Sequence, residues 1–235
     1  MSKHESNSEM TTQHIMEIRY TPSGGFLDTR GYLADYIREG DILPHWQIEE
    51  NVIHFRDDPR EVQEEGAFIG YKNSGYIVYD PETKNYFSDK TKKFWKLFSK
   101  NKEFIIPELS RVGIRSKIFI PIKQEFDFIN HTIASKIYSS SIDALLGSKM
   151  TDSQFVFTLN ESQFQVRIMG GPIHKEEAYR LFDFSSDAFE KCGLFLDIDV
   201  ATTSDLTISK VTSIIDKSME ITWKKIDSFA KELGI

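Results

Sequence analysis

Two carboxylates in one short apolar segment are the residues best placed to do chemistry. Asp197 and Asp199 lie two positions apart in residues 194–200, which are predicted to form a β-strand. Side chains at that spacing point to the same face of a strand, and acidic oxygens gathered on one face can bind a divalent cation. Glu17 or Glu190 could complete such a site. This pattern supports one hypothesis, a metal-dependent hydrolase or nuclease that uses Asp197 and Asp199.

Ion pairs between strands are the favoured alternative for these two aspartates. Polar and basic side chains share a face at even spacing in two other predicted strands: Arg111, Arg115 and Lys117 in one, Gln165 and Arg167 in the other. An antiparallel neighbour that offers cations opposite the aspartates would form ordinary cross-strand pairs. Because a metal site needs several converging ligands, we expect Asp197 and Asp199 to be structural acids. No metal, no cofactor and no catalytic residue is then predicted.

The histidines and the cysteine supply no further catalytic group. The histidines are scattered, at positions 4, 14, 45, 54, 131 and 174, and none has the spacing of a zinc-binding pair. His54 alternates with apolar neighbours and is interpreted as a structural or surface residue. Cys192 has no base and no electropositive setting in the sequence, which favours a small buried residue over a nucleophile. As the sole cysteine it forms no intrachain disulfide, which is consistent with a reducing, cytoplasmic setting.

Known motifs for phosphate binding and group transfer are absent from the sequence. Residues 170–175 contain two glycines but lack the Gly-Lys-Ser/Thr ending of a P-loop and the three-glycine dinucleotide pattern. They follow a predicted hairpin strand instead of opening a helix, so we predict a plain loop. The chain also lacks a serine-hydrolase elbow, a kinase motif set and a paired-cysteine metal motif.

Two charged segments could contact partners. Residues 90–102 interleave six lysines with Phe94, Trp95 and Phe98, a mixture that can bind nucleic acid through charge and stacking. Solvated lysines on an amphipathic helix are favoured, because the net charge of −7 opposes binding to a phosphate backbone. The acidic connection at 57–65 is either a partner-docking element or a solvated loop. A protein partner is therefore expected, and nucleic acid is the disfavoured one.

A long helix near the end of the sequence is expected to cover the strands that hold these residues. Between 206 and 233, apolar side chains recur at steps of three and four, which is one stripe of an amphipathic helix. The stripe comprises Ile208, Val211, Ile215, Met219, Trp223, Ile226, Phe229 and Leu233. Ser204 or Asp205 is the expected N-cap, and Gly234 the expected stop. We predict that the stripe is buried against a sheet.

The other elements fall into two halves with one plan. The first half is predicted to begin with strand 14–20, helix 26–38 capped by Asp28, and a loop through Pro44 and Trp46. Strand 51–56 and a hairpin of 67–72 and 76–80 are predicted to follow. The half is predicted to end with a short strand at Tyr86–Phe87 and a helix capped by Ser88 or Asp89. The second half is predicted as strand 111–122, helix 125–138, a hairpin of 155–159 and 164–169, strand 194–200 and the long helix.

This order predicts an α+β fold in which strand–helix–three strands–helix occurs twice and the antiparallel sheets carry helices on one face. The expected organisation is a flexible tail over 1–12, a first half over 13–105 and a second half over 106–235. Apolar residues make up 40% of the chain, enough for a filled core. No apolar run approaches the roughly 18 residues of a membrane span, and the N-terminus has no signal-peptide core. We therefore expect a cytoplasmic protein with no membrane contact.

Three short segments and the long helix carry a resemblance to a known group of proteins. The segments are Arg111-Val112-Gly113-Ile114-Arg115, Leu196-Asp197-Ile198-Asp199-Val200 and Glu17-Ile18-Arg19. They look like a sporadically distributed family of uncharacterised prokaryotic proteins of about 250 residues. In one departure, Gly113 is followed by isoleucine where such strands often have leucine. The resemblance implies a fold and a prokaryotic origin, and it brings no established activity and no catalytic residues.

Two hypotheses of function follow from the sequence. The first is a non-enzymatic cytosolic module that recognises a protein partner through a sheet face or exposed loops. The patchy distribution of the similar family implies mobile genes, so this module could be an accessory component of a prokaryotic defence-type system. The second is the metal-dependent hydrolase or nuclease at Asp197 and Asp199. Divalent-metal binding by the purified protein separates the two.

Overall fold

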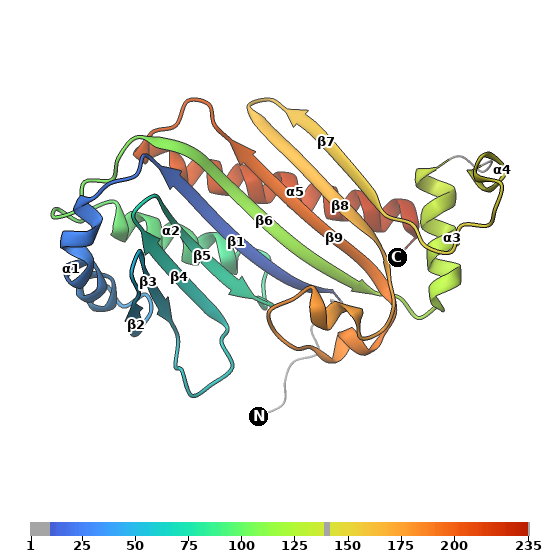
Figure 1. Ribbon diagram of the computed structural model, residues 1–235, viewed down its shortest axis with the longest axis horizontal. Helices are drawn as coiled ribbons and strands as arrows, with labels where there is room; N and C mark the ends of the chain where they lie inside the picture. The colour runs from blue at the N-terminus through green and yellow to red at the C-terminus, as the bar shows by residue number, and fades with distance from the viewer. Residues whose placement is uncertain (1–9, 139–141, 235) are drawn as a thin grey trace.

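One antiparallel sheet organises the residues that the computed structural model describes, 10–138 and 142–234. Within these residues the sheet has nine strands in the order β2-β3-β4-β5-β1-β6-β9-β8-β7 (Figure 1). The strands are β1 (Thr11–Tyr20), β2 (His45–Ile48), β3 (Val52–Arg56), β4 (Glu65–Gly70), β5 (Asn73–Tyr79), β6 (Leu109–Pro121), β7 (Phe155–Glu161), β8 (Phe164–Ile173) and β9 (Gly193–Thr202). The helices are α1 (Gly25–Glu39), α2 (Tyr86–Phe98), α3 (Phe126–Ile137), α4 (Ile142–Leu146) and α5 (Val211–Leu233).

The predicted α+β fold is confirmed, and the two halves follow similar plans, with four strands between α1 and α2 in the first half where three were predicted and three strands between α3 and α5 in the second. In each half the first strand is central, the last strand pairs beside it, and the middle strands step outward to an edge. The central strands β1 and β6 pair antiparallel, with Met16 opposite Ile114, so the halves join in one continuous sheet. Thr11 and Thr12, which the sequence assigns to a tail, belong to β1 and are buried. Residues 1–9 of that expected tail lie outside the described residues.

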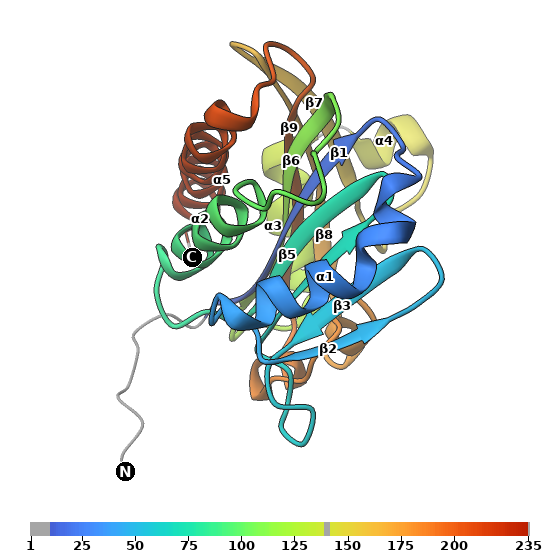
Figure 2. The ribbon, with the colours of Figure 1, turned by 90° about the vertical axis from the view of Figure 1, so that its left-hand side faces the viewer.

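Helices cover one face of this sheet. Figure 2 shows α2 and α5 on the same side of the strands, and α1 and α3 also pack against the sheet through the main core. The predicted stripe of α5 is largely buried there: Val211, Ile215, Met219 and Ile226 are each less than 5% exposed. Burial of a side chain of this size contributes about 1.5–3 kcal/mol. No helix in the described part of the chain is both long enough and apolar enough to cross a bilayer.

Several local predictions are wrong for identifiable reasons. The loop predicted through Pro44 and Trp46 contains β2, a short edge strand whose mostly exposed side chains give no alternating pattern. The strand predicted at Tyr86–Phe87 is the first turn of α2, where Phe87 is fully buried against the sheet-facing core. Gly170 and Gly171 belong to β8 instead of a loop, because that strand continues to Ile173.

The predicted helix N-caps are also wrong, whereas the predicted stop of the long helix is confirmed. Asp28, Ser88 and Asp89 lie inside the first turns of α1 and α2, and Ser204 and Asp205 precede the turn that leads into α5. The N-cap positions are Gly24, Asn85 and Lys210, and none of them makes a side-chain cap hydrogen bond. Gly234 follows α5 with φ of 74°, a left-handed conformation that glycine adopts without strain. Ile208 lies in a 3₁₀ turn before α5 and is exposed.

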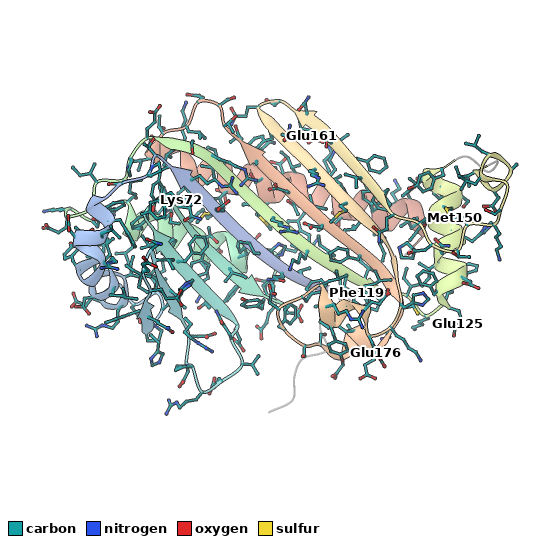
Figure 3. The ribbon with its side chains drawn as sticks, viewed as in Figure 1. Lys72, Phe119, Glu125, Met150, Glu161 and Glu176 are labelled. Atoms are coloured by element: carbon teal, nitrogen blue, oxygen red, sulfur yellow. The ribbon has the colours of Figure 1, made fainter. Side chains whose placement is uncertain are left out.

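The sheet face opposite the helices is called here the open face, and one segment covers part of it. This covering segment, residues 174–191, contains two 3₁₀ turns, Glu177–Arg180 and Asp187–Glu190. Its aromatic side chains pack on β6 and β9 in a second, smaller core of Phe119, Ile173, Ala178, Phe182, Phe189 and Phe195. Figure 3 labels Phe119 of β6 beside the segment that carries Glu176. The rest of the open face is not covered by a helix in the described residues.

Candidate functional site

The centre of the open face carries an array of charged side chains from three neighbouring strands. We call these residues the central charge array: Glu17 and Arg19 of β1, Arg111 and Arg115 of β6, and Asp197 and Asp199 of β9. The alternation along each strand turns the apolar neighbours toward the helices and these polar side chains toward the open face. The three segments that carry the family resemblance therefore lie side by side.

Arg115 and Asp197 form a two-pronged ion pair in this array. Arg115 Nε lies 2.9 Å from Asp197 Oδ1, and Arg115 Nη2 lies 2.6 Å from Asp197 Oδ2. The Asp197 side chain is only 8% exposed, whereas the Arg115 side chain is 51% exposed. Hydrogen bonding to Asp197 raises the pKa of Arg115 above its usual value. The carboxylate is thus buried beneath a guanidinium group that faces solvent.

Arg111 links the two halves of the sheet through a second set of contacts. Its Nη2 lies 2.8 Å from both carboxylate oxygens of Asp199, and its Nη1 lies 3.5 Å from Glu17 Oε2. The guanidinium group lies across Gly113, where a Cβ would come within 2.6 Å of Arg111 Nη1. The glycine of the Arg-Val-Gly-Ile-Arg segment is therefore what allows the arginine to lie flat between the two acids. Arg19 Nε donates a hydrogen bond to the same oxygen, Glu17 Oε2, at 2.7 Å.

The structure places the predicted cross-strand partners together, but the ion pairs are diagonal. In the ladder, Asp199 lies opposite Arg115, and Asp197 lies opposite Lys117. Arg115 instead reaches two residues along β9 to Asp197. Arg111 extends across Gly113 to Asp199, which lies four residues from the position opposite Arg111 in the ladder. Long arginine side chains reach such diagonal neighbours in a sheet.

The two remaining basic residues of the predicted face have different surroundings. Lys117 Nζ donates to the carbonyl oxygen of Leu181 at 2.8 Å and lies 3.7 Å from Asp183, so it anchors the covering segment. Arg167 of β8 lies opposite Asp199 and is exposed. Within residues 10–138 and 142–234, no acidic group lies within salt-bridge distance of Arg167.

The acids proposed as additional metal ligands are separated. Glu17 shares Arg111 with Asp199, whereas Glu190 lies in the second 3₁₀ turn of the covering segment. Among the described residues, no group of three or more His, Cys, Asp or Glu side chains is placed to hold a metal ion. Asp197 and Asp199 each accept hydrogen bonds from an arginine, which already occupies much of their lone-pair capacity.

A buried histidine that the sequence did not single out lies on the other side of the sheet. His14 is fully buried under α2 and α5, between the rings of Phe87 and Trp223. Its Nδ1 lies 2.8 Å from Ser116 Oγ, its partner across the β1–β6 ladder. Burial lowers the pKa of His14 from 6.5 to about 3, so the ring is neutral at physiological pH. The one feature that could have indicated this buried histidine is its position opposite a small polar residue. That position is known only once the register between β1 and β6 is known.

The other histidine and the cysteine discussed above are peripheral. His54 is exposed and lies 3.6 Å from Glu49, so it is a surface residue. Cys192 is partly buried and lines an open cleft of about 760 Å³ near the start of α3. In that cleft the imidazole of His174 stacks on the ring of Phe126.

The lysine-rich helix and the acidic connection both form internal ion pairs. Lys90 Nζ lies 2.8 Å from Glu65 Oε1, and Tyr76 donates a hydrogen bond to the same carboxylate at 2.8 Å. Lys92 Nζ lies 2.7 Å from Asp216 of α5. These contacts join α2 to the sheet and to α5 on the helix-covered side. The basic segment therefore contributes no charge to the open face.

A shallow cleft also opens on the first half of the open face. It has a volume of about 520 Å³ and is bordered by the acidic connection, through Pro59 and Gln63. Phe68 and Tyr79 form part of its lining, together with His45, His54 and Arg56. Tyr79 also contacts Phe184 edge-on, with ring centroids 5.7 Å apart, so the cleft region adjoins the covering segment.

No family model matches the chain, and no curated protein matches it significantly.

Proposed function

We propose that the chain is a non-enzymatic protein-interaction module whose open face binds an acidic surface of a partner protein. The observation that carries this proposal is the difference in solvent exposure between basic and acidic side chains of the central charge array. The side chains of Arg19 and Arg115 are 56% and 51% exposed, whereas those of Glu17 and Asp197 are 24% and 8% exposed. In the Arg111–Asp199 pair the order is reversed, with side chains 21% and 37% exposed, so the guanidinium groups that a partner meets first are those of Arg19 and Arg115. Arginine is enriched in protein interfaces because its planar fork binds carboxylates in two places.

The surroundings of the array favour a protein partner over nucleic acid. Two acidic segments flank the array: the connection at 57–65 with Asp57, Asp58, Glu61 and Glu64, and the covering segment with Glu176, Glu177, Asp183, Asp187 and Glu190. Both project at the lower margin of the sheet in Figure 1. A polyanion that followed the arginines would meet these acids and the net charge of −7, whereas a protein surface can present charges of both signs.

Apolar side chains beside the array supply contact area. Ile15, Phe68 and Ile77 lie on the open face of β1, β4 and β5 and are partly buried. The ring of Phe68 lies over Gly75, where a Cβ would come within 2.4 Å of it, so the ring is held flat against the sheet. A flat apolar surface next to arginines has the composition of an interface core with a polar rim.

Affinity capture with matched variants tests the proposal. The wild-type chain, Arg19→Ala/Arg167→Ala and Lys96→Ala/Lys100→Ala are immobilised and exposed to an extract of the encoding organism. Both double variants remove two exposed positive charges, the first from the open face and the second from the helix-covered side. We expect one protein to be retained in stoichiometric amount by the wild type and the lysine variant and lost by the arginine variant. Cross-links identified by mass spectrometry should map to β1, β6 and β8.

Two results would refute the proposal. Equal retention of partners by all three proteins would exclude the open face as the binding surface. The second result is retention of nucleic acid by the wild type that is lost in the arginine variant and abolished by nuclease. It would show that the open face binds nucleic acid instead of a protein.

Metal binding tests the non-enzymatic part of the proposal. Mg²⁺ and Mn²⁺ are titrated calorimetrically into the wild type and into Asp197→Asn/Asp199→Asn. Because both carboxylates are held by arginines, we expect no difference in cation affinity between the two proteins. Tight binding by the wild type that disappears in the double variant would favour the metal-dependent hydrolase or nuclease instead.

The wider role implied by the family resemblance is a separate part of the proposal. In this part we propose that the module is an accessory component of a prokaryotic defence-type system. Neighbouring genes that encode a nuclease or another effector would support this role. Neighbours of constant housekeeping function across related genomes would contradict it and leave the binding surface unaffected.

A further inference from the structure

The two edges of the sheet differ in how well they are protected against pairing. A strand edge presents unpaired backbone groups, and proteins shield such edges with short strands, proline or charge. The β2 edge has four residues, follows Pro44 and is followed by Glu49 and Glu50. The β7 edge has seven residues, and residues 155–160 contain no proline, no glycine and no charge. Its one charged residue, Glu161, is paired with Lys225 of α5.

Both faces of β7 expose apolar side chains. Val156 on the open face is 54% exposed, and Phe157 and Leu159 on the helix-covered face are 37% and 38% exposed. The ring of Phe155 stacks on Phe157 and on Phe229 of α5, with centroids 5.4 Å apart in both pairs. The main core thus continues outward to the sheet edge, where no other element among residues 10–138 and 142–234 covers it.

The outer side of β7 also retains backbone hydrogen-bonding capacity. Within the described residues, β8 is its sole ladder partner, and it forms the outer margin of the sheet in Figure 1. In an antiparallel ladder, alternate residues turn their N–H and C=O groups away from the neighbouring strand. About half of the backbone groups of β7 therefore point outward, where a further strand would satisfy them.

We propose that β7 pairs antiparallel with β7 of a second copy of this chain, about a two-fold axis at Thr158. This register places Phe157 of one copy opposite Leu159 of the other, and Val156 opposite Asn160. An antiparallel strand is self-complementary about such an axis, so one surface serves both copies. The paired sheets form one continuous sheet, and the uncovered ends of the two cores meet.

A second copy suits this edge because of charge. Each chain carries a net charge of −7, so a contact between copies is favoured where neither contributes an unpaired charge. Between 156 and 160 the register brings together only uncharged residues, and Phe155 of one copy lies opposite Glu161 of the other. The Glu161–Lys225 ion pair neutralises the charge at the hairpin end, which Figure 3 marks by the label on Glu161.

Sedimentation of the purified full chain tests the proposal. The wild type is expected to sediment as a dimer of the 27.2 kDa chain. In Val156→Lys/Leu159→Lys, two like charges per copy enter the edge, and we expect a monomer with unchanged circular dichroism. The matched control is Gln47→Lys on the exposed β2 edge, which should remain dimeric. A monomeric wild type over the whole concentration range, or a dimeric lysine double variant, would overturn the proposal.

Cross-linking tests the register without relying on a destabilising change. In a Cys192→Ser background, Thr158→Cys places two thiols at the axis, whereas Ser162→Cys places them roughly 27 Å apart, at about 3.4 Å per residue. Mild oxidation should convert the first variant, and not the second, into a covalent dimer. Cross-linking of Ser162→Cys at an equal rate, or no cross-linking of Thr158→Cys, would refute this pairing.

Discussion

The buried His14 should make the fold sensitive to mild acid. Its ring is fully buried, and its pKa falls from 6.5 in an unfolded chain to about 3 in the folded protein. Below pH 6.5 the unfolded chain binds a proton that the folded protein does not, so acid favours unfolding. The contribution of the neutral ring to the free energy of unfolding is fully present above pH 6.5 and is lost as the pH falls toward 3. Each pH unit in that window costs about 1.4 kcal/mol.

The variant His14→Asn isolates this contribution. Asparagine can still hydrogen-bond Ser116 but does not titrate, although it loses the ring contacts with Phe87 and Trp223. At pH 7 the variant should be less stable than the wild type because of that lost packing. At pH 4.5 the difference should shrink by about 3 kcal/mol, which is two pH units of the linkage term. Other carboxylates titrate equally in both proteins and cancel in the comparison.

Urea unfolding at pH 7, 6, 5 and 4.5 measures this difference directly. The free energy of unfolding should fall more steeply with acid in the wild type than in His14→Asn. If the two proteins lose stability in parallel over this range, the ring is either solvated or already protonated in the folded state. The reasoning from burial would then be wrong.

Two further predictions concern packing. Trp223→Ala should lower the free energy of unfolding by about 3 kcal/mol, the lower end for large core truncations, because the ring is partly exposed; an unchanged urea midpoint would contradict its burial. Gly75→Ala should destabilise by about 1–3 kcal/mol, since its Cβ would lie 2.4 Å from the carbonyl oxygen of Met16 and from the ring of Phe68. The matched control is Gly31→Ala in α1, where the added methyl meets nothing within 4 Å, and thermal melts should show it more stable by about 0.5–1 kcal/mol. Equal melting temperatures for the two alanine variants would refute the close-approach argument.

The strongest sequence periodicities predicted the fold well. The alternation in β6 and β9 and the stripe of α5 each extend over many residues, and tertiary packing uses them directly. The repeated element order followed from these patterns together with the turns between them. Short elements were less predictable because exposure removes the pattern: three of the four residues of β2 are exposed. Tyr86 and Phe87 have strand propensity, but the packing of α2 on the sheet decides their conformation.

The candidate site was predictable in residue type but not in its pairing. Opposite charges at even spacing in β6 and β9 indicated cross-strand ion pairs. Arg115 pairs with Asp197 because of the register between β6 and β9 and the length of the arginine side chain. The spacing of charges in the sequence does not give this register. The anchoring of Lys117 by Leu181 was hidden because the covering segment has no periodic pattern. Gly113 was the one local hint, since a glycine within a strand indicates a close approach of another group.

The flat, tethered arginines of the open face have a consequence for the entropy of binding. A free arginine loses rotamer freedom when a partner immobilises it, at a cost of about 0.5–1.5 kcal/mol. Arg111 and Arg115 are already held by Asp199 and Asp197, so folding has removed that freedom before any partner arrives. Replacement of both by lysine would preserve the charge but lose the two-pronged bonds that fix the side chains. A partner bound to this lysine-substituted surface would then dissociate faster, with little change in its association rate.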